Sequence, residues 1–316
     1  MHKPLLEPIA LVSDAAGAIK NAFKNVFSNQ NELVTCWAHI KRKIDSKVSM
    51  ISDKSIQEEI VSDIELLQLC ESCELFDKAI KLFERKWKTQ RQTNSHLNDF
   101  LKYFADEWLV ETNRGWYEGV ALFVPSTNNA LEATNRTIKD DSTFRERFSL
   151  SRFLSLATTI VYNWSYERDP TNINVKLFAS EPTISLNLWT KSYEWAKSSK
   201  DIIGEEECSR RVYYIPAAAS EKINESDLVK YKKQCFTTFQ QFKKSFSIWR
   251  LEDGSNWKNA KCNCPAFLKN YICKHVVGLG IRLKQCRPPA AAKHVPIGQK
   301  RKRGRPAKAK KALLVQ

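Results

Sequence analysis

Two short apolar runs, separated by a helical pattern, open the sequence. Residues 9–14 are apolar until they reach Ser13 and Asp14, which predicts a buried strand that ends at a carboxylate. Residues 15–27 repeat apolar side chains with helical spacing, and residues 33–35 form a second strand-like run before another helix begins. The order strand, helix, strand, helix predicts an α/β layer within residues 1–45.

The pattern changes to a purely helical period between residues 46 and 112. Apolar side chains recur there at every third or fourth position, and two stripes stand out. They are Leu75, Phe76, Ala79, Ile80, Phe83 and Trp87, followed by Leu97, Phe100, Leu101, Phe104 and Trp108. We therefore expect an all-helical insertion, in which Asn94 or Ser95 caps the second of these helices.

Residues 113–200 predict a loop followed by two helices. Glycine and proline interrupt residues 114–125, and a polar helix then begins near residue 128. Its Glu132, Asn135, Arg136 and Lys139 share one face. An apolar helix is expected over residues 150–166, and residues 168–200 have no regular pattern. Farther on, residues 205–216 and 246–261 look extended, with Asp253-Gly254 as a hairpin turn.

Charge is distributed very unevenly along the chain. The 316 residues include 51 Lys and Arg and 35 Asp and Glu, a formal net charge of +16. No acidic residue follows Asp253, and residues 254–316 hold 16 basic residues, so residues 1–253 have 51 − 16 = 35 basic and 35 acidic residues. Such a one-sided block indicates an anionic partner, most often nucleic acid, although a solubilising tail is the alternative.

The strongest chemical signal lies inside this basic block. Cys262 and Cys264 form a C-x-C pair, and Cys273 and His275 form a C-x-H pair after eight intervening residues. Three thiolates and one imidazole complete a tetrahedral structural zinc site. Two unrelated pairs of small core residues would be the alternative. We therefore predict Zn²⁺ as a structural cofactor.

These four ligands resemble the SWIM zinc finger, whose pattern is C-x-C, a variable spacer and C-x-H. Pro265 and Phe267 also stand where that family favours proline and an aromatic residue. The resemblance implies binding to DNA or to protein, and SWIM fingers commonly follow a Mutator-like (MULE) transposase domain.

Residues 9–165 resemble the second half of a MULE transposase catalytic domain. The resemblance rests on Asp14 after a strand, the Cys36-x-x-His39 pair, the helical insertion, and Glu132 in an Asn-rich helix start with Asn128, Asn129 and Asn135. It implies a partial RNase H-like fold. It also implies that Asp14 and Glu132 are the second and third acids of a two-Mg²⁺ site for phosphoryl transfer.

The sequence lacks an acid that matches the first of the three. Glu7 is the only acid before Asp14, and it lies too close to it. We expect the chain to be catalytically incomplete, with Mg²⁺ bound only if the site were completed. Taken alone, Asp14 is more simply a helix N-cap and Glu132 a surface acid.

The remaining cysteines are weaker candidates. Cys36 and His39 are expected to orient the helix near the acids as a structural pair, although they could bind metal. Cys70 and Cys73 have the spacing of a second zinc pair, but in an amphipathic helix two small residues usually serve packing.

The C-terminal tail contains a basic motif. Residues 300–308 resemble an AT-hook, whose core is Arg303-Gly304-Arg305-Pro306, preceded by Lys300, Arg301 and Lys302. The glycine and the arginines suit an A·T-rich minor groove. The same run is typical of a nuclear localisation signal, so we expect a nuclear protein.

Together these patterns predict five segments. They are a partial RNase H-like α/β segment at 1–45, a helical insertion at 46–112, the remainder of the transposase-like domain at 113–200, a β-hairpin region with the finger at 201–285 (core 262–275), and a disordered basic tail at 286–316. The fold class is thus α/β with an all-helical insertion, a small zinc-stabilised ββα finger and a tail.

The function these patterns favour is zinc-dependent DNA binding by a protein of MULE descent. The alternatives are an active DDE-type transposase whose N-terminal strands and first aspartate are missing from this sequence, and an adaptor whose finger contacts a protein. No run of about 18 apolar residues and no secretory segment is present, so we expect no membrane partner. Nine irregularly spaced cysteines favour a reducing compartment.

Overall fold

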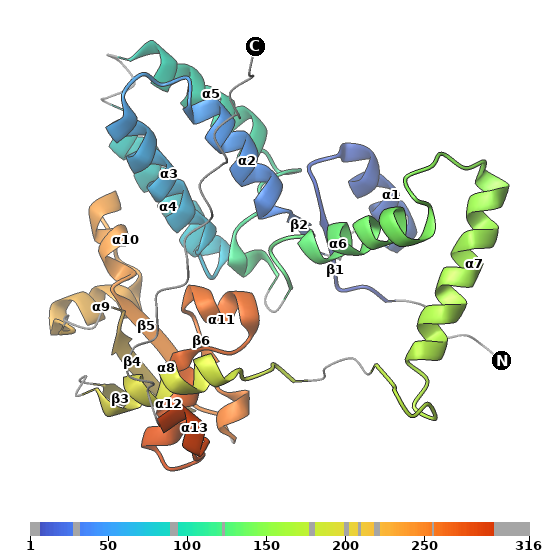
Figure 1. Ribbon diagram of the computed structural model, residues 1–316. Coiled ribbons are helices and arrows are strands. Elements are labelled where there is room, and N and C mark those ends of the chain that lie inside the picture. Colours follow the sequence, from blue (N-terminus) through green and yellow to red (C-terminus); the bar gives the residue numbers. More distant parts are fainter. Residues whose placement is uncertain are drawn as a thin grey trace, which may run out of the picture.

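A computed structural model describes residues 7–27, 32–88, 94–121, 124–176, 181–198, 202–207, 210–217, 222–254 and 256–293. Figure 1 shows four parts: a block of helices, a small sheet with one helix, a projecting arm, and a C-terminal sheet wrapped by short helices. In the described part of the chain, no helix is long and apolar enough to cross a membrane.

The small sheet joins β1 (Ala10–Ser13) to β2 (Glu32–Thr35) in parallel, with Ala10 opposite Glu32. The crossover contains α1 (Gly17–Phe27), as expected for parallel strands, which need a long connection. Lys20 of α1 is buried, and its ammonium donates to the side-chain oxygen of Thr35 at 3.1 Å and to the carbonyl of Thr112 at 2.7 Å. Burial lowers the pKa of Lys20. This lysine therefore ties α1 to the sheet and to the end of the helical block.

The helical block confirms the helical period found in the sequence. Its helices are α2 (Trp37–Val48), α3 (Lys54–Gln68), α4 (Cys73–Trp87) and α5 (Ser95–Trp108). Asp53, Ser72 and Asn94 cap α3, α4 and α5 by accepting hydrogen bonds from backbone N–H groups of the first turn. The predicted stripes of α4 and α5 face one shared core, with only Ile80 and Leu101 partly exposed.

Trp116 lies at the centre of this core although it follows the predicted end of the insertion at residue 112. Its ring stacks on Trp37 with centroids 5.6 Å apart and meets Phe76 and Phe104 edge-on. Its indole N–H donates to the Trp108 carbonyl at 2.9 Å. The loop after α5, which continues to η2 (Glu118–Val120), thus folds back into the helical core.

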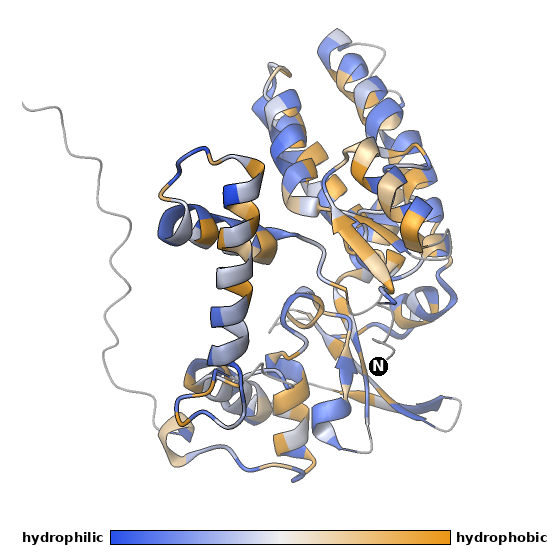
Figure 2. Cartoon of the chain, turned by 90° about the vertical axis from the view of Figure 1, so that its right-hand side faces the viewer, coloured by the Kyte–Doolittle hydropathy of each residue, from blue (hydrophilic) through white to orange (hydrophobic). Residues whose placement is uncertain are grey.

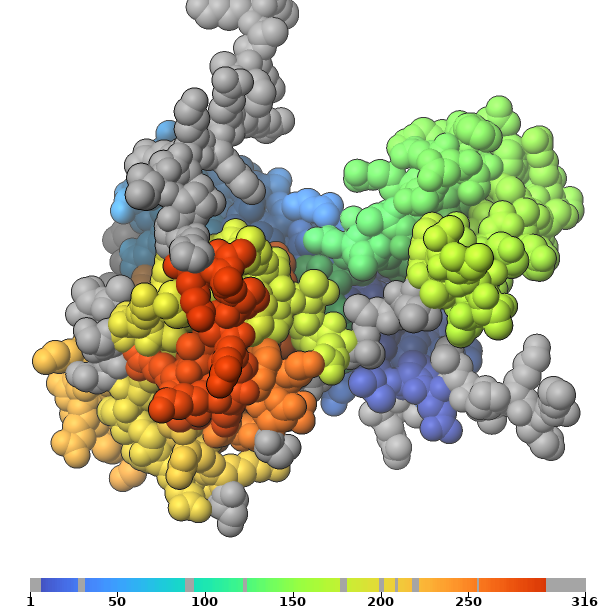
Figure 3. Space-filling view, turned by 60° about the horizontal axis from the view of Figure 1, so that its bottom comes forward, coloured from blue at the N-terminus to red at the C-terminus, as the bar shows by residue number. Residues whose placement is uncertain are grey.

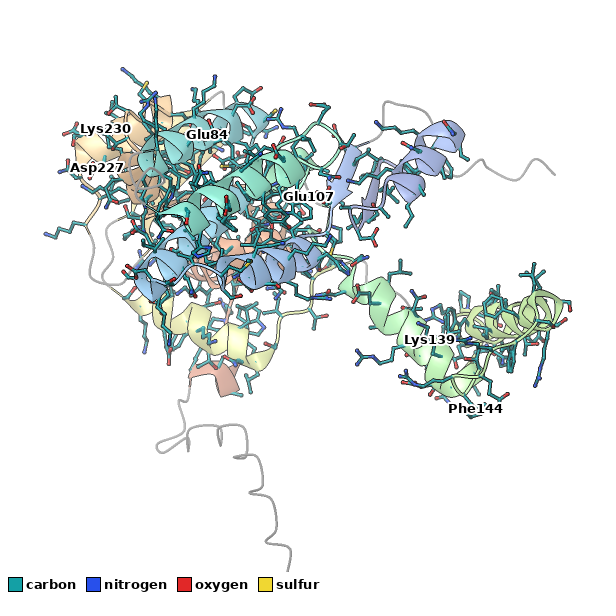
Figure 4. All side chains as sticks on the ribbon, turned by 90° about the horizontal axis from the view of Figure 1, so that it is seen from above. Glu84, Glu107, Lys139, Phe144, Asp227 and Lys230 are labelled. Atoms are coloured by element: carbon teal, nitrogen blue, oxygen red, sulfur yellow. The ribbon has the colours of Figure 1, made fainter. Side chains whose placement is uncertain are left out.

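The arm consists of α6 (Asn129–Thr137), the π-helical turn η3 (Ile138–Ser142) and α7 (Leu150–Glu167). No residue of α6 is buried, and Ile160 is the buried residue of α7. Figure 2 shows hydrophobic and hydrophilic residues mixed along α7, and Figure 4 shows Lys139 and Phe144 well away from the helical block. The apolar side chains expected along α7 are present, but only Ile160 among them is buried.

The C-terminal part is built on a four-stranded antiparallel sheet in the order β3-β4-β5-β6. Its strands are β3 (Ile203–Glu207), β4 (Arg210–Pro216), β5 (Ile248–Glu252) and β6 (Lys261–Cys262). The helices around it are α8 (Leu186–Lys197), α9 (Glu225–Lys233), α10 (Phe239–Ser245), η4 (Trp257–Asn259), α11 (Pro265–Asn270), α12 (Lys274–Arg282) and α13 (Ala290–Lys293). In Figure 3 the red C-terminal helices pack among yellow segments near residue 200.

Several expectations for this part need correction. Residues 205–216 are not one extended piece but a hairpin of β3 and β4, and Asp253-Gly254 starts a longer connection through η4 rather than a tight turn. The helix α8 forms in a stretch where the sequence shows no regular pattern, and it packs on α12, on the other side of the expected boundary at residue 200. The tail was expected to be disordered from residue 286, but α13 forms within it and buries Ala292 against α8.

We predict that replacing Trp116 with alanine lowers the free energy of unfolding by about 3–5 kcal/mol, the usual cost of removing a buried aromatic side chain. Urea unfolding of the full chain, followed by circular dichroism, measures this loss. The matched control is Tyr162→Ala on α7, where the ring is 69% exposed, and it should change the value by less than about 0.5 kcal/mol. Equal losses in both variants would contradict the central position of Trp116.

Candidate metal centre

The four predicted ligands come from three consecutive elements of the C-terminal part. Cys262 is the last residue of β6 and pairs with Leu251 of β5. Cys264 is the N-cap of α11, and Cys273 is the N-cap of α12. His275 follows in the first turn of α12. The eight-residue spacer is thus mostly the short helix α11, which returns the chain to the end of β6.

The ligand atoms of these residues converge in the interior. All four side chains are buried, and their ligand atoms lie within 4.8 Å of one another. The Sγ of Cys262 lies 3.8 Å from Nδ1 of His275. Ligands that hold zinc at about 2.0–2.3 Å in a tetrahedron are about 3.5–3.8 Å apart. The cluster therefore needs only a small contraction to coordinate the ion.

Without a metal ion, the pKa values of the three thiols are shifted in opposite directions. Burial raises the pKa of Cys262 and raises the pKa of Cys273 to about 12. Hydrogen bonds from the thiols of Cys262 and Cys273 hold the pKa of Cys264 far below its usual value. One thiolate is thus stabilised by two neighbouring thiols, and a bound Zn²⁺ takes the place of their protons.

The residues fit a zinc ion by the position and by the chemistry of their donor atoms. Nδ1 of His275 faces the sulfur of Cys262 at 3.8 Å, at the buried centre of the cluster. In addition, three sulfur donors and one nitrogen donor are a closed structural set for zinc, with no position left for substrate. The four residues are positioned to bind a structural zinc ion.

Apolar packing fixes the position of α12 beside the cluster. The Trp195 ring of α8 meets the His275 ring edge-on with centroids 5.6 Å apart. A Cβ on Gly278 would lie 2.4 Å from Cε3 of Trp195, so only glycine lets the two helices approach this closely. Arg282 donates to the Ala196 carbonyl at 2.9 Å and lies over the Trp195 ring. The metal centre thus includes α8 as a supporting wall.

Asn263, between the first two ligands, connects the metal centre to the rest of the protein. Its side-chain oxygen accepts from the Arg250 N–H at 2.8 Å, and its amide group donates to the Tyr231 hydroxyl at 2.7 Å and to Glu71 at 3.2 Å. Glu71 belongs to the helical block, 192 residues away in sequence. No local pattern in the sequence marks this residue, because its partners are set by the tertiary fold.

The Cys36–His39 pair lies beside the Asn-rich helix start that includes Asn128 and Glu132. The Cys36 thiol donates to the Asn128 side-chain oxygen at 3.1 Å, and Nε2 of His39 lies 3.1 Å from a carboxylate oxygen of Glu132. Arg42 lies 3.9 Å from the same carboxylate. The start of α2 and the start of α6, 92 residues apart in sequence, therefore form one polar cluster.

Asp14 has a different role from Glu132. Its carboxylate accepts a hydrogen bond from the Ala16 N–H at 3.2 Å, as a residue just before a helix often does. Over the described ranges, the zinc cluster is the one group of three or more His, Cys, Asp and Glu side chains with metal-binding geometry. Asp14, His39 and Glu132 do not form such a group.

The other sequence candidates divide into two classes. Cys70 is buried, which raises its pKa above its usual range, whereas Cys73 is exposed, so this pair does not converge on a metal site among the described residues. All tail candidates, Lys300, Arg301, Lys302, Arg303, Gly304, Arg305 and Pro306, lie outside the described residues.

We predict one Zn²⁺ per chain by elemental analysis, and its loss in Cys264→Ser. Because zinc supplies about 10–16 kcal/mol of folding free energy to small fingers, chelation should abolish hydrogen-exchange protection in β5, β6 and α12, while α3 and α4 keep theirs. Cys235→Ser, at an exposed cysteine outside the cluster, is the control and should retain the metal. Zinc-free protein with intact protection in α12 would contradict this prediction.

Comparisons with known proteins agree with this geometry. Residues 255–283 match the SWIM zinc finger family, a range that includes all four ligands. No curated protein and no solved structure gave a significant match to the chain. The C-terminal part of the protein therefore contains a SWIM zinc finger with its ligands positioned for a structural zinc ion.

Proposed function

We propose that the protein is a zinc-dependent DNA-binding protein of the nucleus. The observation that carries this proposal is the absence of any acidic residue after Asp253, in a segment that contains the zinc finger. Five basic residues of the described finger region have no acidic partner within ion-pair distance. They are Lys269, Lys274, Lys284, Arg287 and Lys293.

Unneutralised lysines and arginines attract nucleic acid through the phosphate backbone. Each phosphate that they neutralise releases condensed counterions, which supplies much of the binding free energy at moderate salt. Residues 1–253 are neutral overall and offer no net attraction. The binding surface is therefore the finger with the basic tail, and import into the nucleus follows from the same basic run around Arg303.

We further propose that residues 9–165 descend from a MULE transposase domain. Three features support this ancestry: the parallel pair of β1 and β2 around α1, the contact of Cys36 with Asn128, and the contact of His39 with Glu132. These contacts join the same sequence pieces on which the resemblance rests. Because Asp14 binds the α1 backbone and Glu132 binds His39 and Arg42, we propose no DNA cleavage.

A protein-binding adaptor is the second candidate, and the arm favours it. The exposed fractions of Leu154, Val161 and Tyr162 on α7 are 56%, 60% and 69%. Apolar side chains gathered on one projecting helix suit contact with another protein. Loss of DNA retention on deleting the finger and tail, with α7 intact, would count against the adaptor.

The tail prediction follows from the charge distribution. Residues 293–316 hold nine basic residues, and each phosphate contact adds about 0.9 to the magnitude of the log–log salt slope on duplex DNA. Deleting them should weaken binding and reduce the slope by several units in titrations at graded salt. A truncated chain with an unchanged slope would exclude the tail from DNA contact.

A two-residue change tests the AT-hook-like motif. Replacing Arg303 and Arg305 with alanine should reduce the preference for A·T-rich over G·C-rich duplex more than it reduces total affinity, because the minor-groove contact is lost. Replacing Lys308 and Lys310 removes the same charge outside the Arg-Gly-Arg-Pro core and should leave the preference unchanged. Equal changes in preference would contradict the groove contact.

The catalytic prediction is an absence of activity. Purified chain with Mg²⁺ or Mn²⁺ should not cleave labelled DNA ends, since two-metal catalysis needs carboxylates that converge on both ions. Cleavage that disappears in Asp14→Asn or Glu132→Gln, but persists in Asp53→Asn at a helix cap remote from both, would show this expectation to be wrong.

A further inference from the structure

A groove of about 1050 Å³ lies between α8 and the zinc centre. One wall is formed by α8, with Lys191 and Trp195 facing the groove. The other wall is formed by Lys269 of α11 and by Cys273, Lys274 and His275 at the start of α12. Two of the zinc ligands are thus part of the groove wall, so the shape of the groove depends on the folded metal centre.

The charge of this groove is positive. Three lysines, Lys191, Lys269 and Lys274, line it, against one acid, Glu194. None of these lysines has an ion-pair or hydrogen-bond partner in the described part of the chain, whereas Lys258, on the same finger but outside the groove, is paired with Glu181 at 2.6 Å. Three free ammonium groups around one concave surface favour an anionic ligand.

The start of α12 forms part of the same wall and is occupied by the metal centre. Cys273 at its N-cap and His275 in its first turn are zinc ligands, and the backbone N–H of Val276 interacts with the Cys273 sulfur. Helix N-termini carry a partial positive charge, which adds to the charge of the three lysines. The positive side of the groove is therefore held in place by the zinc site.

We propose that this groove holds the backbone phosphates of nucleic acid, bound by Lys191, Lys269 and Lys274. The proposal rests on the proposed DNA-binding function and places α8, which precedes the SWIM match, in the binding surface. It also predicts that binding requires zinc, because loss of the metal removes the ordered wall that carries Lys274.

The test uses full-length, zinc-loaded protein and a fluorescein-labelled DNA duplex titrated at several salt concentrations. Lys191→Gln combined with Lys269→Gln should lower affinity by about fivefold per lysine at 0.15 M salt and reduce the salt slope by about 1.8, since each phosphate contact releases about 0.9 counterions. Lys274 is left unchanged because it lies between two zinc ligands.

The matched control is Lys197→Gln combined with Lys230→Gln. It removes the same charge from α8 and from α9, and neither lysine lines the groove. This control should change affinity by less than about twofold. Equal losses in both double variants would overturn the groove and leave general electrostatic attraction. Absence of binding by the unmodified protein would instead overturn the proposed function itself.

A competition experiment separates the alternatives. Polyglutamate at equal charge should compete poorly with the duplex. Equal competition would identify an acidic protein as the ligand and overturn the assignment to nucleic acid.

Discussion

Burial of three thiols and one imidazole within 4.8 Å of one another is the constraint on which the C-terminal part depends. Burial disfavours thiolates, as the raised pKa values of Cys262 and Cys273 express, yet a metal ion requires them. The charge of zinc offsets this penalty, and its coordination energy becomes folding energy. The sheet edge at β6 and the start of α12 meet at this point, and the apolar core that includes Leu251 and Val276 packs beside it.

The helix α8 and Asn263 connect the metal centre to other parts of the protein. The fit of Trp195 against Gly278 locks α8 on α12, and Asn263 hydrogen-bonds to Glu71 in the helical block. Phe239 and Phe242 of α10, which precede β5 in sequence, are buried in that same helical core. The finger is therefore anchored on the helical block, so its basic surface keeps a fixed orientation.

The N-terminal polar cluster joins the start of α2 to the start of α6. The pairs Cys36 with Asn128 and His39 with Glu132 hold the arm onto α2, together with the backbone bond from the Trp37 N–H to the Ser126 carbonyl. Glu132 contacts His39 and Arg42 there, while Asp14 accepts a hydrogen bond at the start of α1. Both acids thus have structural partners that compete with a divalent ion.

The sequence by itself determined the zinc ligands, the helical period of the block and the strand–helix–strand order, because each is a local pattern of spacing. Only the tertiary structure decided where Trp116, α8 and α13 belong. Trp116 lies in a loop, where no periodic pattern marks a buried residue. The apolar residues of α8 around Trp195 pack against a partner helix, and they do not form a regular stripe in the sequence. The groove arises from residues far apart in sequence, Lys191 and Lys269, and such a juxtaposition carries no local signal. Long-range packing sets these features, since burial of an aromatic ring or a lysine stem depends on which surface the chain later returns to.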